Sequence, residues 1–323
     1  MKKKNYWWQL GQLFFHFKKK SVKLPFYPIR LWIEPTNDCN YACVMCPNKD
    51  LKEKGYMEFI LFQKIIDEVK SSTFDINIVH RGESLLHPQI IEMITYAKSH
   101  GLYVRMHTNG SLLTEEMAVK ILRSGLDQIS FSFDGYDKET YEKIRKGGNF
   151  DQTFRNIIRF LEIKKENHSK TPKTAVEVID FGGKIGKKFR KMKTSFLRSF
   201  ENLPLENLVI KEFHNWAGEL GKKEPPKNFA ICPFPWNALV ICWDGTVVAC
   251  TQDFFNKNLL GNIKKNSVKE IWNGQRMQNL RKKMAARDIG EFETCSQCDR
   301  LQRKRFLGIP KGYIWKFITK QMP

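Results

Sequence analysis

Three cysteines, Cys39, Cys43 and Cys46, lie close together in the segment NDCNYACVMC (37–46). Thiolates at spacings of four and three residues are suited to hold a metal, but a structural zinc site normally has four protein ligands. The segment contains no histidine, and the next cysteine along the chain is Cys232. The local set is therefore one ligand short, and an open coordination position is typical of a metal centre that takes part in chemistry.

A second set of cysteines lies near the C-terminus and consists of Cys232, Cys250, Cys295 and Cys298. Its spacing fits either a four-cysteine zinc ribbon or an iron–sulfur cluster. The chain between the first two predicts a hairpin that turns at Asp244-Gly245, and Ser267 is placed to cap a following helix. The remaining cysteine, Cys242, stands in the middle of a strand and is interpreted as a small core residue. Free thiolates in this number are typical of a reducing cytoplasm.

The chain between the two sets alternates between predicted strands and helices. We expect strands at 29–35, 75–84, 102–110, 126–135, 174–181 and 206–213, with helices at 59–72, 88–101, 114–125, 152–165 and 187–200. Such alternation predicts a parallel sheet, curled or doubly wound. The cysteine segment and three other polar motifs follow directly after strands, at the end where α/β folds assemble their active sites.

In this context the first cysteine motif resembles the signature of the radical S-adenosylmethionine (SAM) enzymes. The resemblance covers roughly residues 29–215 and implies an α/β fold, a partial (β/α)6 TIM-like barrel. In that family, three cysteines hold three irons of a [4Fe–4S] cluster, and the fourth iron binds the amino and carboxylate groups of SAM. The resemblance therefore implies that SAM supplies the missing ligand. It also implies reductive cleavage of SAM to a 5′-deoxyadenosyl radical that takes a hydrogen atom from a substrate C–H bond.

Five residues match positions that contact SAM in the family. Gly82 and Glu83 stand in Arg-Gly-Glu-Ser, whereas the family usually has Gly-Gly-Glu-Pro, so the ends of this motif depart from the pattern. Asn109 and Ser132 fit the motifs of the third and fourth strands, although Asn-Gly and Asp-Gly are also common turn sequences. Arg145 matches a recurrent arginine that would pair with the SAM carboxylate, and the alternative is a solvated helix charge.

The second cysteine set, with the Pro-Trp, Asp-Gly and Leu-Gly-Asn-Ile motifs around it, is similar to the auxiliary-cluster domain called SPASM in its shortened "twitch" form. The resemblance implies that its four cysteines ligate a second [4Fe–4S] cluster in a small C-terminal α+β domain. The predicted organisation is a basic amphipathic segment, a radical SAM core, a linker, the auxiliary domain and a basic aromatic tail, at 1–28, 29–217, 218–230, 231–307 and 308–323.

A second cluster favours oxidation of the substrate, because the substrate radical can pass an electron to it if a base takes up a proton. The candidate bases are Glu34 at the end of the first strand, Glu177 in the fifth, and Lys211, with Glu212 and His214 beside it, around the sixth. The sequence does not rank them. His80 and His107 are interpreted as strand histidines satisfied by their neighbours.

The first twenty residues combine aromatic side chains with lysines. They lack a signal-peptide cleavage pattern and are too polar to span a membrane. On helical spacing, Trp7, Leu10, Phe14 and Phe17 fall on one face. This pattern fits either a helix lying on anionic lipid or a helix packed against the protein itself. The segment 312–321 repeats the combination of aromatic residues and lysines.

The net charge of +21, from 55 Lys and Arg against 34 Asp and Glu, favours an anionic partner. We expect an oxidoreductase acting on a sugar, an amino sugar or a lipid- or nucleotide-linked glycan, since only about thirty residues precede the first strand, too few for a peptide-recruiting domain. The alternatives are a maturase of ribosomally made peptides and an RNA-modifying or RNA-binding protein that uses the lysines of 184–193. Expected partners are a flavodoxin- or ferredoxin-type electron donor and an anionic or lipid-linked substrate, with nucleic acid disfavoured. The expected location is the cytoplasm, with peripheral contact at the inner face of the membrane.

Overall fold

A computed structural model of the chain describes residues 3–180, 187–222, 228–302, 305–306 and 309–310. The chain forms two compact units. The first contains Arg30–Phe213 and Val240–Gly245; the second contains the N-terminal segment to Ile29, His214–Leu239 and the chain from Thr246 on. The N-terminal segment thus belongs to the same unit as the C-terminal part of the chain, although the residues of the first unit separate these two segments in the sequence.

The first unit is built on six parallel strands. They are β1 (Arg30–Ile33), β2 (Asp75–Ile78), β3 (Tyr103–Thr108), β4 (Gln128–Ser132), β5 (Lys173–Asp180) and β6 (Asn207–Glu212). Each strand pairs in parallel with the next one along the chain. The predicted parallel sheet of a partial barrel is therefore confirmed.

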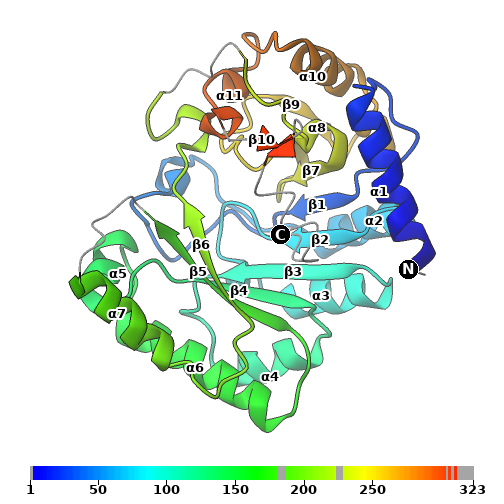
Figure 1. Cartoon of the computed structure of the whole chain (residues 1–323). Helices are drawn as coiled ribbons and strands as arrows, with labels where there is room; N and C mark the ends of the chain where they lie inside the picture. Colours follow the sequence, from blue (N-terminus) through cyan, green and yellow to red (C-terminus); the bar gives the residue numbers. More distant parts are fainter. Residues whose placement is uncertain (1–2, 181–186, 223–227, 303–304, 307–308, 311–323) are drawn as a thin grey trace. The chain divides into compact units, whose positions relative to one another are not determined.

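Helices cover one face of this sheet (Figure 1). They are α2 (Phe59–Val69), α3 (Ile90–Ser99), α4 (Glu115–Arg123), α5 (Lys138–Ile144), α6 (Phe150–Glu166) and α7 (Lys187–Arg198). The strand residues on that face are apolar and fully buried, among them Ile78, Met106, Ile129 and Val176. Burial of this apolar layer supplies the main stabilisation of the unit.

The opposite face of the sheet is polar, because side chains alternate between the two faces of a strand. Near the amino ends of the strands, Arg30 Nε lies 2.5 Å from Asp75 Oδ1 and Arg105 Nη2 lies 3.3 Å from Asp75 Oδ2. Near the carboxyl ends, the same face carries His107 on β3 and Glu177 on β5. We call this surface the polar face.

Helix α5 was not predicted from the sequence. It is held by ring contacts: Phe133, after β4, lies 4.5 Å from the ring of Tyr141 on α5, 5.3 Å from Phe150 and 5.4 Å from Phe196. Its short sequence, KETYEKI, has little apolar periodicity, and Asp137 caps its first turn. Tertiary packing of one tyrosine therefore fixes an element that the local pattern does not indicate.

The second unit contains the antiparallel pair β8 (Thr246–Val248) and β9 (Leu259–Asn262). Its helices include α1 (Lys3–Lys18), α8 (Phe234–Asn237), α9 (Val268–Trp272), α10 (Gln275–Ala286) and α11 (Glu293–Ser296), and β7 (Ala238–Ile241) runs from this unit into the first. Ser267 caps α9 in a capping box, as predicted. The remaining short elements are η1 (Pro47–Asp50), η2 (Ser84–Leu86), η3 (Trp216–Gly218), η4 (Asp299–Gln302), β10 (Arg305–Phe306) and β11 (Ile309–Pro310).

The expected apolar face of the N-terminal helix is corrected by the structure. Leu10 is buried and Phe17 lies 5.5 Å from the ring of Trp236, whereas Trp7 and Phe14 are exposed. A helix turns 100° per residue, so these four positions spread over about 80° of the helix circumference. Leu10 and Phe17 fall on the part that packs against the protein, and Trp7 and Phe14 fall outside it. The aromatic tail of 312–321 and Lys184 to Gly186 of the basic run lie outside the described residues.

Within the part of the chain that the structure describes, no helix is both long and apolar enough to cross a membrane.

Candidate active site

The cysteine loop, residues 39–46, follows β1 and is held by main-chain hydrogen bonds. Ala42 N donates to Lys146 O at 2.8 Å, and Val44 N donates to Ile144 O at 2.9 Å. These bonds tie the loop to the end of α5 and the turn that follows it. The helix that the sequence did not predict therefore positions the loop.

The three thiols of this loop lie within electrostatic reach of one another. Cys43 is buried, and Cys39 and Cys46 are half-buried. Burial, with smaller contributions from the charges of the neighbouring thiols, raises the pKa of Cys39 to about 12 and that of Cys46 to about 11. Such mutual charge effects require that the groups lie near one another. Among the described residues, no three Cys, His, Asp or Glu side chains are arranged closely enough to hold a metal ion, so the fit to a cluster with one open iron rests on the three cysteines of this loop, since cysteine thiolate is the usual ligand of such clusters.

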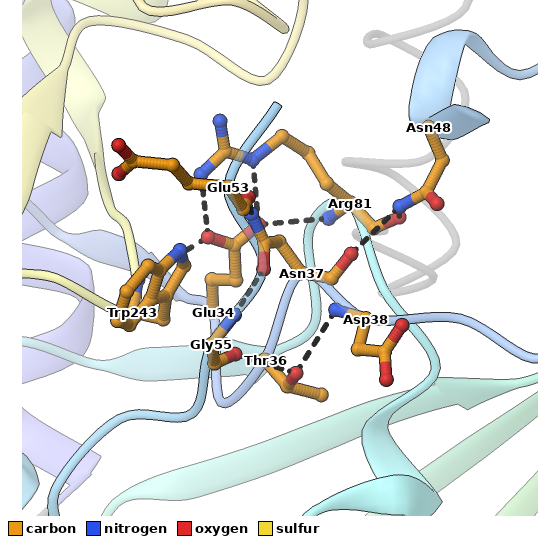
Figure 2. Close-up of polar contacts among 9 residues, drawn as sticks. All are labelled: Glu34, Thr36, Asn37, Asp38, Asn48, Glu53, Gly55, Arg81 and Trp243. Carbon is orange, nitrogen blue, oxygen red and sulfur yellow. Dashed lines mark hydrogen bonds and ion pairs between the residues drawn. The ribbon is translucent and has the colours of Figure 1, made fainter. Parts of the chain in front are cut away.

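A polar frame shapes the chain in front of the loop (Figure 2). Asn37 Nδ2 donates to Glu53 O at 2.8 Å, and Asn37 Oδ1 accepts from Gly55 N at 2.9 Å. Thr36 Oγ1 donates to Gly55 O at 2.7 Å and accepts from Asp38 N at 2.9 Å. Paired bonds of this kind hold the two segments side by side, so the polar residues before the cysteines have a structural role.

Glu34 and Arg81 form a buried ion pair next to this frame (Figure 2). Arg81 Nε donates to Glu34 Oε1 and Arg81 Nη2 to Glu34 Oε2, both at 2.7 Å, with side-chain exposures of 4% and 0%. Trp243 N also donates to Oε2, at 3.2 Å. Burial alone would raise the pKa of Glu34, but bonding to Arg81 brings it below its ordinary value. Both oxygens are engaged, so the geometry describes a positioning residue; a role as base stays a prediction.

Gly82 stands where two backbone segments come into contact. A Cβ at this position would lie 2.4 Å from the carbonyl oxygens of both Thr36 and Asp38. Glu83 N donates to Asp38 O at 2.8 Å. Only glycine allows so close an approach of the two backbones. The side chain of the preceding residue, Arg81, pairs with Glu34 instead. The chain thus keeps the close contact of the motif although the preceding residue is arginine.

The Glu83 carboxylate joins the ends of β2 and β3. Its Oε1 accepts from Leu85 N at 3.0 Å and Thr108 Oγ1 at 2.8 Å, and its Oε2 accepts from Asn109 N at 2.7 Å. Burial raises the pKa of Glu83 above its ordinary value, and these donors partly oppose that effect. The sequence predicted a cofactor contact here, and the structure adds a structural role.

We expect Glu83→Gln to lower both stability and SAM affinity. One carboxylate oxygen becomes an NH2 group that faces an N–H donor, and an unsatisfied buried group costs about 1–3 kcal/mol. Thermal unfolding and equilibrium SAM binding measure the two effects. Glu139→Gln, at an exposed position on α5, is the matched control. An unchanged unfolding temperature would show that the three donors do not hold this carboxylate in solution.

Asn109 links the third strand to the cysteine loop. Its Nδ2 donates to Asn40 Oδ1 at 2.9 Å, and its Oδ1 accepts from Ser111 N at 2.9 Å. Gly110 has a φ of +80°, as a turn requires. Asn109 therefore performs the turn chemistry considered as an alternative and also contacts the loop. Ser132 is half-buried on the polar face. Direct contacts of both with SAM stay predictions.

Arg145 is a buried residue beside the cysteine loop, so its interpretation as a solvated helix charge is wrong. It is 7% exposed, its Nη2 lies 2.5 Å from Asp134 Oδ2, and its Nη1 lies 3.9 Å from Cys43 Sγ. Asp134 Oδ1 accepts from Ile179 N at 2.6 Å. Arg145 Nε is buried without a hydrogen-bond partner among the described residues. A cation with an unused donor next to the thiols fits a site for an anionic cofactor group.

Three side chains meet on the polar face at the carboxyl ends of the strands. His107 Nδ1 lies 3.3 Å from Glu177 Oε2, and Lys211 Nζ bonds the same oxygen. Burial alone would raise the pKa of Glu177, but the charge of His107, when its ring is protonated, and the charge of Lys211 hold it well below its usual range. The sequence indicated Glu177 and Lys211 as separate base candidates and His107 as a strand histidine satisfied by a neighbour, and the structure identifies that neighbour as Glu177. Side chains alternate between the two faces along β3 and β5, and this alternation places His107 on the same face of the sheet as Glu177.

The other four cysteines gather within the second unit. Cys298 is buried, and Cys232, Cys250 and Cys295 are half-buried. Burial raises the pKa of Cys295 well above its ordinary value, and the charges of the other three thiols add to the shift. The four thiols therefore lie within electrostatic reach of one another, and four is the number of cysteines that such a cluster needs. Cys242 is fully buried and belongs to the first unit.

One carboxylate holds this second donor set together. Asp253 Oδ1 accepts from Thr294 Oγ1 at 2.9 Å, which joins the loop after Cys250 to the helix that carries Cys295. Asp253 also accepts from Lys257 N and Asn258 N, both at 2.8 Å. These bonds fix the distance between cysteines that are far apart in the sequence.

The fold and the two thiol sets agree with comparisons to known families. The model of the radical SAM superfamily matches residues 33–172, and the SPASM model, described as an iron–sulfur cluster-binding domain, matches residues 232–299. The chain belongs to the radical SAM superfamily and carries a C-terminal SPASM domain. Its cofactors are accordingly SAM with a [4Fe–4S] cluster, and auxiliary iron–sulfur in the SPASM domain.

Individual relatives differ in what they modify. The chain is 25% identical over 289 residues to a tungsten-containing aldehyde ferredoxin oxidoreductase cofactor-modifying protein from Pyrococcus furiosus, covering 76% of this chain and 81% of that one. It is 34% identical over 132 residues to the mycofactocin maturase MftC from Mycobacterium tuberculosis, covering 40% of this chain and 34% of the relative. Streptococcus suis SuiB bound to its precursor peptide SuiA has the same fold, with a TM-score of 0.65, 14% identity and coverage of 90% and 74%.

Proposed function

We propose that this protein uses radical SAM chemistry to oxidise a small polar substrate with an anionic group, held on the polar face. Cys39, Cys43 and Cys46 would ligate the SAM-binding cluster, and the four cysteines of the second unit would ligate a single auxiliary [4Fe–4S] cluster. The preferred substrate is a sugar, an amino sugar or a lipid- or nucleotide-linked glycan. The observation that carries the proposal is the group of His107, Glu177 and Lys211 at the carboxyl ends of β3, β5 and β6.

The polar face offers what such a substrate requires. Lys211, with 45% of its side chain exposed, supplies a cation for an anionic group. Ser130 Oγ and Asn77 Nδ2, on the same face, are buried without hydrogen-bond partners among the described residues. Buried polar atoms normally find partners, so these two suit the hydroxyl groups of a polyol.

We assign the proton transfer to His107. Bound SAM with its cluster would supply the abstraction of a hydrogen atom from the substrate, and the auxiliary cluster would accept the second electron. One proton of the substrate then remains for a protein side chain to remove. A carboxylate with a lowered pKa binds a proton weakly, so Glu177 is poorly suited to act as the base. It is better suited to orient His107 through Nδ1, leaving Nε2 to accept the proton. Lys211 holds Glu177 from the other side.

This assignment predicts that His107→Gln separates two steps. Deuterium from a labelled substrate should still enter 5′-deoxyadenosine, while formation of the oxidised product falls by about a hundredfold, a typical loss for a general base. Mass spectrometry of both products measures the ratio. Lys173→Gln, at an exposed position near the amino end of β5, is the control. Parallel loss of label and product would contradict a role confined to proton removal.

The class of substrate is tested with the unmodified protein. Deuterated sugar nucleotides and polyprenyl-linked sugars are compared with peptides encoded beside the protein's own gene. We expect label in 5′-deoxyadenosine from a carbohydrate. Label from a peptide alone would overturn the carbohydrate assignment and leave the radical chemistry in place.

Peptide maturation is the second candidate function, because it has specific support. MftC is named as a maturase, and the SuiB structure contains a precursor peptide. An extended peptide would lie along the same polar face. For either substrate, we propose a reducing cytoplasmic setting and a flavodoxin- or ferredoxin-type protein as the electron donor. An RNA substrate has no comparable support, and Lys184 to Gly186 of the basic run lie outside the described residues.

A further inference from the structure

Helix α1 carries four exposed aromatic side chains. Trp7, Trp8, Phe14 and Phe15 are 56%, 68%, 54% and 56% exposed. The two pairs are seven residues apart, close to two helical turns, so they form one stripe along the helix. We call these four residues the aromatic stripe. Large aromatic side chains gathered on a surface in this way mark an interaction site more often than scattered ones.

The other side of α1 is fixed to its own unit. Leu10 is buried, the ring of Phe17 lies 5.5 Å from that of Trp236, and the ring of His16 lies 5.6 Å from that of Phe26. His16 Nδ1 also lies 2.9 Å from Ser21 Oγ. The helix is therefore formed and oriented by contacts that do not involve the stripe, and binding through the stripe carries little cost of folding.

The C-terminal end of this helix and the residues that follow it are cationic. Lys18 Nζ lies 5.7 Å from the centre of the Phe14 ring, and Lys19 Nζ lies 5.9 Å from that of Phe15. Both lysines are exposed, and no acidic residue precedes Glu34 in the chain. Aromatic rings bordered by ammonium groups fit the interfacial region of a bilayer, where rings enter the boundary layer and cations meet acidic headgroups.

We propose that the aromatic stripe of α1 docks the protein onto an anionic lipid surface. A second copy of this chain fits the same stripe poorly, because α1 contains no acidic residue, so two copies in contact through it would offer no carboxylate to the lysines at either end of the helix. Docking in this way places the protein beside lipid-linked molecules. It does not depend on which substrate the enzyme oxidises.

Vesicle co-sedimentation of the full chain tests the proposal. The wild-type protein should sediment with vesicles of phosphatidylcholine and phosphatidylglycerol, and more weakly with phosphatidylcholine alone. Trp7→Gln, Trp8→Gln, Phe14→Gln and Phe15→Gln combined should lower the partition coefficient at least tenfold. Lys18→Gln with Lys19→Gln should lower it about thirtyfold on the anionic vesicles only, since each lysine near an acidic surface contributes about 1 kcal/mol.

Ile60→Gln is the matched control, because Ile60 is 68% exposed on α2 of the other unit. It should leave sedimentation unchanged, and circular dichroism melting should show that every variant folds. Equal partitioning of the fourfold variant and the wild type would overturn the proposal. The proposal would also be overturned if the wild-type protein did not sediment with vesicles, or if analytical ultracentrifugation showed a dimer that the fourfold variant does not form.

Discussion

Replacing Cys39, Cys43 and Cys46 with alanine should halve the iron content and abolish SAM cleavage. Two [4Fe–4S] clusters correspond to about eight iron atoms per chain, and the variant should keep about four. The loop that follows β1 contains these three cysteines, and their thiols lie within electrostatic reach of one another. Without them a cluster at this position has no protein ligand. Iron and sulfide assays after anaerobic reconstitution, with detection of 5′-deoxyadenosine, measure the result.

The control for this experiment is Cys242→Ala. Cys242 is fully buried and belongs to the first unit, whereas the four auxiliary cysteines belong to the second, so its removal should leave the iron content unchanged. Replacing those four cysteines instead should remove the other half of the iron. Stoichiometric zinc in the second unit would show that the auxiliary donor set is a zinc site.

Arg81→Met should destabilise the protein by about 3–5 kcal/mol, because it leaves the buried carboxylate of Glu34 without its partner. Two donors of Arg81 reach the two oxygens of Glu34, and both side chains are almost fully buried. Gly82 follows directly and approaches two backbone oxygens, so a shift of this segment should also weaken SAM binding. Denaturant unfolding and SAM titration measure the two effects.

Two comparisons make this prediction specific. Lys138→Met breaks an ion pair with Asp151 whose side chains are 57% and 50% exposed, and it should cost less than about 1 kcal/mol. Arg81→Met combined with Glu34→Leu should recover part of the stability, since a buried pair can often be replaced by apolar residues. Simple addition of the two single losses would show that these residues do not act as a pair.

The sequence by itself indicated the superfamily and most of the architecture. Cysteine spacing groups the first three thiols without any fold, because they lie within one loop, whereas the second set is recognised only together with the motifs around it. Hydrophobic periodicity predicted the six strands, since each is long enough to bury an apolar face, as Ile129 and Val176 do. Such local signals survive in a single sequence because burial and turn chemistry act on neighbouring residues.

Only the tertiary structure decided how distant residues are used. Arg145 could not be distinguished from a surface charge, because its environment comes from Asp134 and Cys43. His107 could be placed beside Glu177 only from the parallel pairing that brings β3, β4 and β5 into register. The N-terminal helix shows the same limit. The positions of its aromatic residues in the sequence do not determine which of them are buried, because burial depends on packing partners such as Trp236, more than two hundred residues away in the sequence.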